Sequence, residues 1–387
     1  MKRMRLTLIW VVLCGLILCP SLTSGAEPRF RAVFVGDIMA HREQLDGARR
    51  GKGVWDFKPQ FRRVKPLFSD ALAVGNLETV FAGEKSGFAG YPSFNTPDSL
   101  AEALTDLGVK VLTLANNHIL DRGVTGASRT IDVLDSADIF WTGLSRGEIE
   151  PDEPLVLEYA GLRWAFASWS YGSNRVLASG DVRLNTISAE AVQRGLDRAR
   201  LASPDILVAC FHWGEEYRYV PTRSQREIAA LCVENGVDLV IGTHPHVLQP
   251  IEIVSSGGKR HLVVWSLGNF VSYQRTLPRE RSCVLAVDFE KLQDGGLVLS
   301  RVSVAPTRVS VTRREGRYLC EVVCGGESDR FNHAGLPASE LKLLRKASRA
   351  VLDFLGASGE ADEEGFYTLW DLRSPDVLPK GRIKSPL

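Results

Sequence analysis

Short apolar runs that end in histidine and other metal-binding side chains recur along this 387-residue chain, and five of its seven histidines follow such runs. The runs of Val, Ile, Leu, Ala and Phe predict buried strands. Open α/β sheets bind ligands beyond the carboxyl ends of their strands, so these separate segments can converge on one crevice. The pattern therefore predicts an α/β protein built around a metal site. The polar residues concerned are Asp37, His41, Asn76, Glu78, Asn117, His118, Asp121, His212, His244 and His246.

The composition fits a large folded domain, alone or with an appendage, because 44% of the residues are hydrophobic and 24% are charged. The net charge is +1, and Lys and Arg never occur in runs longer than two residues. This distribution excludes the basic footprint of a nucleic-acid-binding protein. We therefore expect a small or polymeric substrate that is not a nucleic acid.

The first 26 residues resemble a secretory signal peptide. Lys2, Arg3 and Arg5 form a basic start, Leu6 to Cys19 form an apolar run, and Ser24-Gly25-Ala26 offers a cleavage site. The alternative is an uncleaved membrane anchor, although the apolar run is shorter than the roughly 20 residues that a spanning helix needs. We expect an exported protein, periplasmic or at the cell surface, whose mature chain starts near Glu27.

Predicted strands and helices alternate from about Phe30 to about Pro306, which favours parallel strands joined by crossover helices. We assign 30–310 to one α/β domain, and 311–387 to a C-terminal extension with a hairpin turn at 313–316 and an amphipathic helix at 338–355. The other predicted helices are 97–107, 123–136, 188–201 and 222–235. The predicted strands are 30–35, 71–75, 109–114, 138–142, 155–159, 162–169, 205–211, 237–241, 261–266 and 283–289.

The strongest single motif is Gly242-Thr243-His244-Pro245-His246, directly after the apolar run VDLVI. Two histidines one residue apart on an extended loop point to the same side, and Pro245 restricts the backbone between them. Both imidazoles can then face one site. The alternative is a pair of histidines on a surface loop, which the similar placement of His212 after another run disfavours.

Asn117, His118 and Asp121 form a second cluster. An amide oxygen is a neutral metal ligand, the adjacent histidine is free for proton transfer, and Asp121 can hold its ring if the turn is helical. The alternative is that Asn117 and Asp121 cap the following helix. Asp37 and Glu78 offer carboxylates to the same site, although a strand-end Asp after Gly is also ordinary in turns.

The candidate donors are two carboxylates, one amide and up to four imidazoles, without thiolate. This mixture suits Mn, Fe or Zn, and it exceeds what one tetrahedral ion needs. We therefore expect two divalent transition-metal ions, which at about 3.5–4 Å apart can clamp the oxygens of a displacement at phosphorus.

The segment after His212 is predicted to border the substrate. The segment Trp213-Gly214-Glu215-Glu216-Tyr217 combines aromatic surface with two acids on an exposed strand-end loop, and Trp213, Glu215 and Tyr217 are its candidate substrate contacts. The alternative is that Trp213 and Tyr217 pack against the next helix.

The strings GDIM, GNLET, LANNHILDRG, FHWGEEY, GTHPHVLQPIE and WSLGNFV, in this order over residues 35–271, resemble the capsule synthesis protein CapA family, which supports poly-γ-glutamate synthesis. That family is similar to the calcineurin-like metallophosphoesterases, so the resemblance implies a four-layer sandwich of two mixed sheets between helices. It also implies that His118 is a proton donor or transition-state stabiliser. The metal ligands that it implies are Asp37, His41, Glu78, Asn117, His212, His244 and His246.

The chain departs from the phosphoesterase pattern at three places. Asp37 and His41 are separated by three residues where the pattern has Asp-x-His. At the second strand the carboxylate is Glu78 rather than an Asp directly after Gly75. The acidic partner of the histidine is Asp121 rather than the next residue.

Three functions are consistent with these features. The first is an exported CapA-type protein that supports synthesis or export of poly-γ-glutamate or a related anionic polymer, with a membrane polymer-synthesis complex as its partner and a hydrolase-like metal site. The second is a metal-dependent phosphoesterase or peptide-modifying enzyme, hydrolase or epimerase, without a capsule role. The third is a non-catalytic assembly subunit. Metal content and turnover distinguish the first two from the third.

Overall fold

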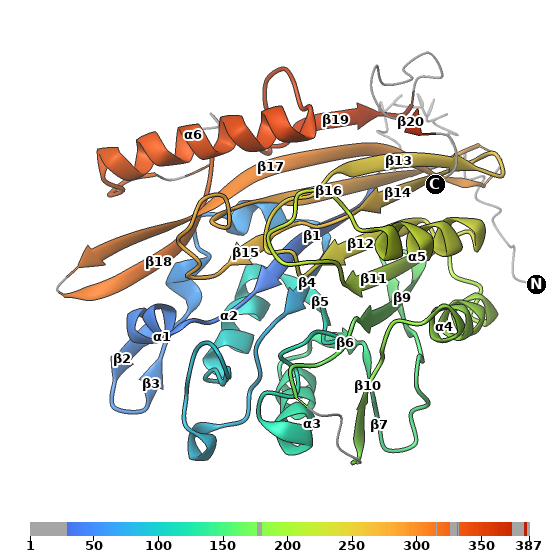
Figure 1. Ribbon diagram of the computed structural model, residues 1–387. Coiled ribbons are helices and arrows are strands. Elements are labelled where there is room, and N and C mark those ends of the chain that lie inside the picture. The colour runs from blue at the N-terminus through green and yellow to red at the C-terminus, as the bar shows by residue number, and fades with distance from the viewer. Residues whose placement is uncertain are drawn as a thin grey trace, which may run out of the picture.

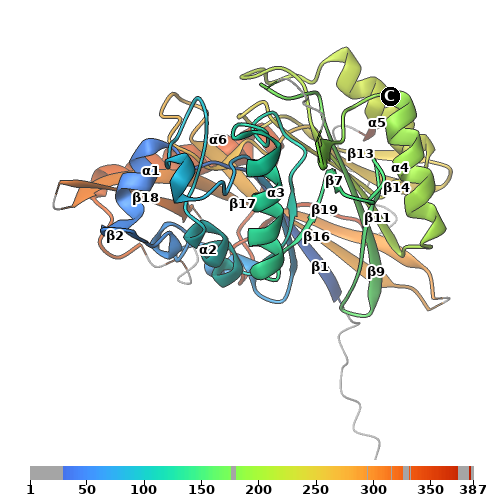
Figure 2. The ribbon, with the colours of Figure 1, turned by 90° about the horizontal axis from the view of Figure 1, so that it is seen from below.

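The computed structural model describes residues 29–175, 180–293, 295–314, 316–325, 331, 333–373 and 383–384. Two mixed β-sheets stack face to face, and helices cover their outer faces (Figures 1 and 2). The predicted α/β fold, a four-layer sandwich of two mixed sheets flanked by helices, is confirmed. The predicted signal peptide, residues 1–26, lies outside the described residues.

The first sheet has the strand order β18-β17-β16-β1-β4-β5-β6, with β15 beside β1 and β19 beside β17. Strands β1, β4, β5 and β6 are parallel, whereas β16, β17 and β18 continue the sheet in antiparallel fashion. The bounds are β1 (Arg29–Ile38), β4 (Leu72–Leu77), β5 (Val109–Thr113), β6 (Phe140–Thr142), β15 (Asn269–Val271), β16 (Arg281–Lys291), β17 (Leu297–Arg314), β18 (Arg317–Cys324) and β19 (Tyr367–Asp371).

The second sheet has the order β20-β13-β14-β12-β11-β9-β8, with parallel strands β9, β11, β12 and β14 at its centre. Its strands are β8 (Leu155–Tyr159), β9 (Leu162–Ser170), β11 (Ile206–His212), β12 (Leu239–Thr243), β13 (Ile251–Ser256), β14 (Lys259–Val264) and β20 (Ile383–Lys384). Two small antiparallel pairs lie outside the sandwich: β2 (Arg49–Gly51) with β3 (Val54–Trp55), and β7 (Leu144–Arg146) with β10 (Val182–Leu184).

Helices α2 and α3 cover the first sheet, and α4 and α5 cover the second (Figure 2). Helix α6 lies along β16 and β17 at the antiparallel end of the first sheet (Figure 1). The α-helices are α1 (Arg42–Ala48), α2 (Ser99–Leu107), α3 (Gly123–Ser136), α4 (Ala189–Leu201), α5 (Arg223–Glu234) and α6 (Ala338–Leu355), and the 3-10 helices are η1 (Lys58–Gln60), η2 (Lys65–Phe68) and η3 (Glu84–Ser86).

One of the large buried clusters lies between the two sheets. Phe34 and Val74 of the first sheet pack with Phe166, Val208 and Ile241 of the second, all nearly or fully buried. Such residues come from apolar runs that are buried on both faces, because helices cover the outer sides. The strands therefore read as continuous apolar stretches, and their first polar residues appear where they end.

The two sheets approach each other closely near the carboxyl ends of their parallel strands. After β14 the chain crosses at 265–268 from the second sheet to β15 of the first. A Cβ on Gly36 would lie 1.8 Å from the carbonyl oxygen of Gly268, and one on Gly242 would lie 2.1 Å from that of Trp265. Only glycine permits this close packing of backbones.

The predicted C-terminal elements are present. The hairpin expected at 313–316 joins β17 and β18, and the helix expected at 338–355 is α6. The predicted boundary at residue 310 falls within β17, and strands β17, β18 and β19 belong to the first sheet. Within the described residues, no helix has the length and apolarity needed to cross a membrane.

Candidate metal centre

Six of the predicted metal ligands lie together where parallel strands of both sheets end. The first sheet contributes Asp37 at the end of β1, Glu78 after β4 and Asn117 after β5. The second sheet contributes the other three, His212 at the end of β11, and His244 and His246 after β12. All six side chains are buried. The carboxylates and the amide of the first sheet therefore face the imidazoles of the second sheet.

Asp37 is held from both sides. The amide nitrogen Nδ2 of Asn76 donates to its Oδ1 at 2.8 Å, and Nδ1 of His246 lies 3.0 Å from its Oδ2. The hydroxyl of Thr113 donates to Oδ1 of Asn76 at 3.1 Å, which fixes the amide orientation. The side chain is thus aimed into the site, and the alternative of a strand-end Asp in a surface turn does not describe its position.

Glu78 is fully buried, and neither of its carboxylate oxygens has a hydrogen-bond partner. Its Oε1 lies 3.7 Å from Nε2 of His212 and 3.7 Å from Nε2 of His246. Burial, followed by the neighbouring Asp37 carboxylate, raises its pKa well above the ordinary value. A buried carboxylate without a donor is costly unless a cation compensates it. This side chain is the strongest sign that the site is made for metal.

His212 is positioned by two neighbours. Its Nδ1 lies 3.1 Å from the hydroxyl of Thr243, and its Nε2 lies 2.9 Å from Oδ1 of Asn117. Burial, followed by the other histidines, lowers the pKa of His212 well below its usual value. The ring is therefore neutral near pH 7, which is the form that binds metal.

The His244-Pro245-His246 segment differs from the extended loop that the sequence predicts. His244 has φ of 97° and His246 has φ of 57°, so both residues adopt left-handed backbone conformations. Such conformations in non-glycine residues cost about 1–3 kcal/mol and recur at functional sites. The prediction of an extended backbone is wrong, because the chain turns sharply here, yet both rings still face the site with centroids 5.9 Å apart.

His244 contributes a second unpaired group. Its Nδ1 is buried without a hydrogen-bond partner, and burial lowers its pKa to about 4. The ring lies 4.7 Å from that of His212 and 4.5 Å from that of Tyr171. A neutral imidazole with an unpaired Nδ1, grouped with Glu216 and His246, matches the donor chemistry of Mn, Fe or Zn sites.

The ligand atoms fall into two groups that can each hold a cation. Asp37, Glu78 and His212 form one group, and Glu216, His244 and His246 form the other, with ligand atoms within 4.8 Å of one another in each. Glu216 lies in the segment that was predicted to border the substrate, but it was not predicted as a metal ligand. Its neighbour Glu215, which was predicted to contact substrate, is exposed and pairs with Arg218 at 3.1 Å.

His118 lies beside these groups rather than within them. Its Nδ1 is 2.8 Å from Oδ2 of Asp121, and the same oxygen accepts the backbone N–H of Phe94 at 2.7 Å. Because a carboxylate only accepts, Nδ1 carries the ring proton and Nε2 faces outward with Asn174 Nδ2 at 3.4 Å. The alternative of helix capping is not observed, since the N-cap of α3 is Arg122 without a side-chain bond.

His41 is the predicted ligand that the structure leaves out of both groups. Its Nδ1 accepts the backbone N–H of Tyr273 at 3.2 Å, and burial lowers its pKa to about 4. Its Nδ1 is thus occupied by a backbone donor, and His41 belongs to neither group of candidate ligands. Its displacement from the Asp-x-His spacing places it at the start of α1, where the local chain direction has already changed.

The predicted substrate-facing aromatic residues lie in different environments. Trp213 is 3% exposed, stacks on Phe211 and donates its indole N–H to the carbonyl of Trp265 at 3.0 Å. It therefore packs in the core, as the alternative proposed. Tyr217 instead lies at the site, with its ring centroid 6.2 Å from that of His246. Burial, followed by a hydrogen bond with Glu216, raises the pKa of Tyr217 to about 12.

Two further tyrosines line the mouth of the site. Tyr171 is half exposed over His244, and burial, followed by the charges of Glu216 and Glu78, raises its pKa. Tyr91 is 70% exposed, with its ring 6.4 Å from that of His118. Neither was predicted from the sequence, since each follows a segment without a histidine.

Asn76 and Asn269 orient the ligands from behind. Oδ1 of Asn269 lies 3.0 Å from Nδ1 of His246, the same nitrogen that contacts Asp37. Both asparagines fall in strings that support the family resemblance, GNLET and WSLGNFV, so their position in these motifs was an available signal. Such supporting groups fix the tautomer and direction of a metal-binding imidazole.

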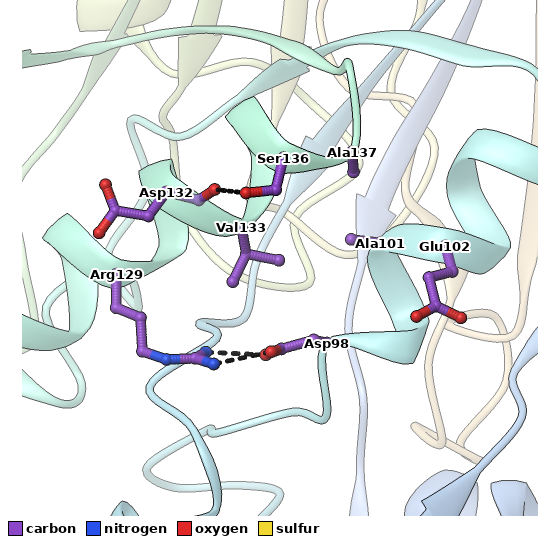
Figure 3. A pocket seen from close by; sticks show the side chains of 8 residues that line it. All are labelled: Asp98, Ala101, Glu102, Arg129, Asp132, Val133, Ser136 and Ala137. Atoms are coloured by element: carbon purple, nitrogen blue, oxygen red, sulfur yellow. Dashed lines mark hydrogen bonds and ion pairs between the residues drawn. The ribbon is translucent and has the colours of Figure 1, made fainter.

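A separate hollow of about 430 Å³ lies between α2 and α3, away from these groups (Figure 3). Asp98 at the start of α2 and Arg129 of α3 face each other across it, with bonds of 2.8 and 2.7 Å. Asp98 and Arg129 are thus already paired with each other and partly exposed. It shows none of the buried unpaired groups that mark the metal centre.

The fold and the donor set place this chain among α/β proteins with a candidate site for divalent metal ions. The model of the bacterial capsule synthesis protein family PGA_cap matches residues 31–274. The chain belongs to this family, and the predicted resemblance to CapA proteins is confirmed.

Similar proteins include two from Bacillus. The capsule biosynthesis protein CapA of Bacillus anthracis is 27% identical over 247 residues, 61% of this chain and 58% of that protein. The PGA biosynthesis protein CapA of Bacillus subtilis is 27% identical over 293 residues, 74% of each chain. Weak structural similarity extends to a 5'-nucleotidase from Candida albicans, with 11% identity and a TM-score of 0.42, covering 86% of this chain and 61% of that one.

Proposed function

We propose that this protein is an exported accessory protein that supports the biosynthesis or export of poly-γ-glutamate or a related anionic capsule polymer through a metal-dependent hydrolytic site. Family membership and the names of the Bacillus relatives support the capsule role. The single observation that supports a metal-dependent site is Glu78, a fully buried carboxylate without a hydrogen-bond donor between two histidines.

The residues present fit a pair of divalent transition-metal ions. Asp37, Glu78 and His212 would hold one ion, and Glu216, His244 and His246 the other, with Asn117 next to His212 as an additional oxygen donor. Such ions polarise a carbonyl or phosphoryl oxygen and lower the pKa of bound water. Mn, Fe and Zn are the candidates, because the donors are oxygen and nitrogen without thiolate.

His118 would move the proton. Its Nδ1–H is held by Asp121, so Nε2 is the atom that can take or return a proton at the reacting group. Asp121 is itself fixed by the backbone N–H of Phe94 and acts as a positioning residue. The rings of Phe94 and Tyr91 around His118 limit the access of water to this nitrogen.

The test combines elemental analysis with two hydrolysis assays, one with a γ-glutamyl peptide and one with a generic phosphodiester. We expect up to two transition-metal ions per chain and γ-glutamyl hydrolysis that chelation abolishes. The double variant His244→Ala/His246→Ala should lose metal. His118→Ala should keep its metal and lose about 10²–10⁴-fold in turnover.

Other outcomes would favour the other functions. Phosphodiester hydrolysis without γ-glutamyl turnover would favour a phosphoesterase, and full metal occupancy without any turnover would favour an assembly subunit. Full metal occupancy in the double variant would refute the site itself, whereas metal loss in His118→Ala would mean that His118 is a ligand.

Export forms part of the proposal and rests on Lys2, Arg3, Arg5 and the apolar run from Leu6 to Cys19. Cell fractionation followed by N-terminal sequencing tests it. A mature chain that starts near Glu27 outside the cytoplasm is expected. An intact Met1 on protein recovered from the cytoplasm would contradict export.

A further inference from the structure

Arg279 lies beside the metal centre without an acidic partner. Its guanidinium carbon is 3.3 Å from the centroid of the Tyr217 ring, and the side chain is half buried. Among the described residues, no carboxylate lies within ion-pair distance of this guanidinium. The fully buried arginines Arg31 and Arg308 are paired with Asp288 and Glu280, whereas the half-buried Arg281, two residues further along, also has an Nε without a partner. Arg279 is therefore a half-buried cation without a direct carboxylate partner, and Glu216 reaches only the tyrosine on which Arg279 lies.

The backbone of Arg279 is tied to the residues that orient the metal ligands. Its carbonyl oxygen accepts Nδ2 of Asn269 at 3.0 Å, and Oδ1 of the same asparagine lies 3.0 Å from Nδ1 of His246. Its N–H donates to the carbonyl of Thr276 at 2.9 Å, closing a turn. These contacts fix the position from which the side chain reaches Tyr217.

The backbone of Tyr217 is also fixed in position. Its φ of 65° is a left-handed conformation that a bulky side chain rarely adopts, and its N–H donates to the carbonyl of Pro245 at 2.8 Å. This bond connects it to the His244-Pro245-His246 turn. A strained backbone at a site that the surrounding contacts maintain indicates a functional position. Arg279 and Tyr217 together form a preorganised surface, here called the arginine platform, 6.2 Å from the His246 ring.

A guanidinium that stacks on an aromatic ring keeps the N–H groups in its plane available for hydrogen bonds. These donors match both oxygens of a carboxylate or a phosphate, and the contact with the ring reduces the rotamer freedom lost on binding. Acceptance of an anion would also neutralise a cation that stands next to a site for divalent metal. The platform therefore has the chemistry of an oxyanion receptor at the edge of the reaction centre.

We propose that the arginine platform binds an oxyanion of the substrate next to the group that reacts at the metal centre. The inference rests on the proposed function and extends it. In a γ-linked glutamate chain, every amide bond has a free α-carboxylate beside it, so the platform would select such residues by their carboxylate. A phosphate group offers the same pair of oxygens, and the experiment separates the two sources.

The experiment uses the metal-loaded full chain and measures binding of two probes by calorimetry, inorganic phosphate and γ-glutamyl-glutamate. Arg279→Gln should weaken binding of the preferred probe by about 10–100-fold, the range of a lost charge-assisted pair. Arg279→Lys should recover part of the affinity, because it restores the charge and not the planar fork. Metal content and thermal midpoint should remain those of the wild type. Arg223→Gln is the matched control, since Arg223 is exposed on α5 and pairs only with Glu227.

Stronger binding of the γ-glutamyl probe, with the larger loss in Arg279→Gln, would identify a carboxylate as the ligand, and the reverse order would identify a phosphate. Equal affinities of wild type and Arg279→Gln for both probes would overturn the inference, as would a loss of metal in Arg279→Gln, which would indicate a purely structural role. Dependence of binding on Arg279 without any γ-glutamyl hydrolysis would leave the inference standing and refute the proposed function.

Discussion

Two regions of the molecule bury charged side chains, and these side chains are paired in one region and unpaired in the other. At the junction of α6 with the first sheet, Arg308 is 1% exposed and pairs with both Glu280 and Glu340, and the hydroxyl of Ser310 donates to Glu340 at 2.8 Å. At the metal centre, Glu78 is 0% exposed and has no donor, and Nδ1 of His244 has no partner.

The difference shows which of the two regions is complete without a ligand. Buried charges that satisfy one another fix the arrangement of the elements that carry them, as α6 is fixed to β16 and β17. Buried groups that remain unpaired cost free energy and persist only where a ligand compensates them. The predictions below test this contrast between the α6 junction and the metal centre.

The largest effect is expected at the α6 junction. Arg308→Ala leaves the partly buried Glu340 without its cation and leaves the buried Glu280 with Arg275 alone, so the free energy of unfolding should fall by about 3 kcal/mol, the lower end of the range for a broken buried pair. Urea unfolding of the metal-free proteins measures it. Arg223→Ala, which breaks an exposed pair on α5, is the control and should change stability by less than about 0.5 kcal/mol. Similar losses in both variants would remove the distinction between buried and exposed pairs.

Glu78→Gln should raise, rather than lower, the free energy of unfolding of the metal-free protein. Burial raises the pKa of Glu78 in the folded state, so its ionisation above pH 4.5 favours the unfolded chain. Removing the charge should therefore stabilise the metal-free protein at pH 7 by about 2–3 kcal/mol, the cost of an unsatisfied buried group. The same variant should lose the increase in thermal midpoint on metal addition. Destabilisation of the metal-free variant would show that Glu78 has a structural partner after all.

The pH dependence of the free energy of unfolding should reflect the lowered pKa of His244. Burial lowers its pKa to about 4, whereas the unfolded chain takes up the proton near pH 6.5. The unfolded state thus binds more protons between these values, and stability should fall as the pH drops below 6.5. Between pH 6.5 and 5 the loss is about 2 kcal/mol.

His244→Asn removes one of several rings with a lowered pKa, so it should reduce the slope of the pH profile of the metal-free protein over this range by the share of His244, while His41 and His212 still contribute. Urea unfolding at pH 7, 6 and 5 provides the measurement. Equal slopes in wild type and variant would place the titration elsewhere.

The smallest expected effect is a difference in metal affinity between variants of Glu215 and Glu216. Glu216→Gln should weaken the affinity for the second metal ion by about tenfold, roughly 1.4 kcal/mol, because a carboxylate ligand becomes an amide. Glu215→Gln should leave metal affinity unchanged, since its carboxylate faces Arg218. Metal titration of both variants measures the difference. Equal losses would mean that the loop contributes only its overall charge.

The sequence predicted the strands and the convergence of the site because both depend on local pattern. Each predicted strand is present, although β6 and β8 are partly exposed, and the polar residues at or after the ends of β1, β4, β5, β11 and β12 met at one edge. The alternation of side chains along a strand could also have predicted the position of Trp213. Side chains alternate along a strand, so with His212 facing the site, Trp213 shares the opposite face with Phe211 and packs there at 4.5 Å.

Other features depend on contacts that no local pattern specifies. His41 is occupied by the backbone N–H of Tyr273, a residue far away in the sequence. Glu216 rather than Glu215 reaches His244 because the loop passes through left-handed conformations at Gly214 and Tyr217. Arg279 acquires its role only through stacking on Tyr217. Long-range partners and positive φ values in the loop set these positions.

The crossing of the chain at 265–268 has a consequence for the lifetime of the folded state. Here the N–H of Asp37 in β1 donates to the carbonyl of Gly268 at 2.9 Å, and the N–H of Leu267 donates to that of Gly242 in β12 at 3.2 Å. Asp37 and Glu78 come from the first sheet and His212 from the second, so an ion held by these three residues would cross-link the two sheets. Without the ion, the sheets are held together here by apolar contacts and a few backbone hydrogen bonds. The native state would then unfold only after the ion had left, and the rate of unfolding would follow the concentration of free metal.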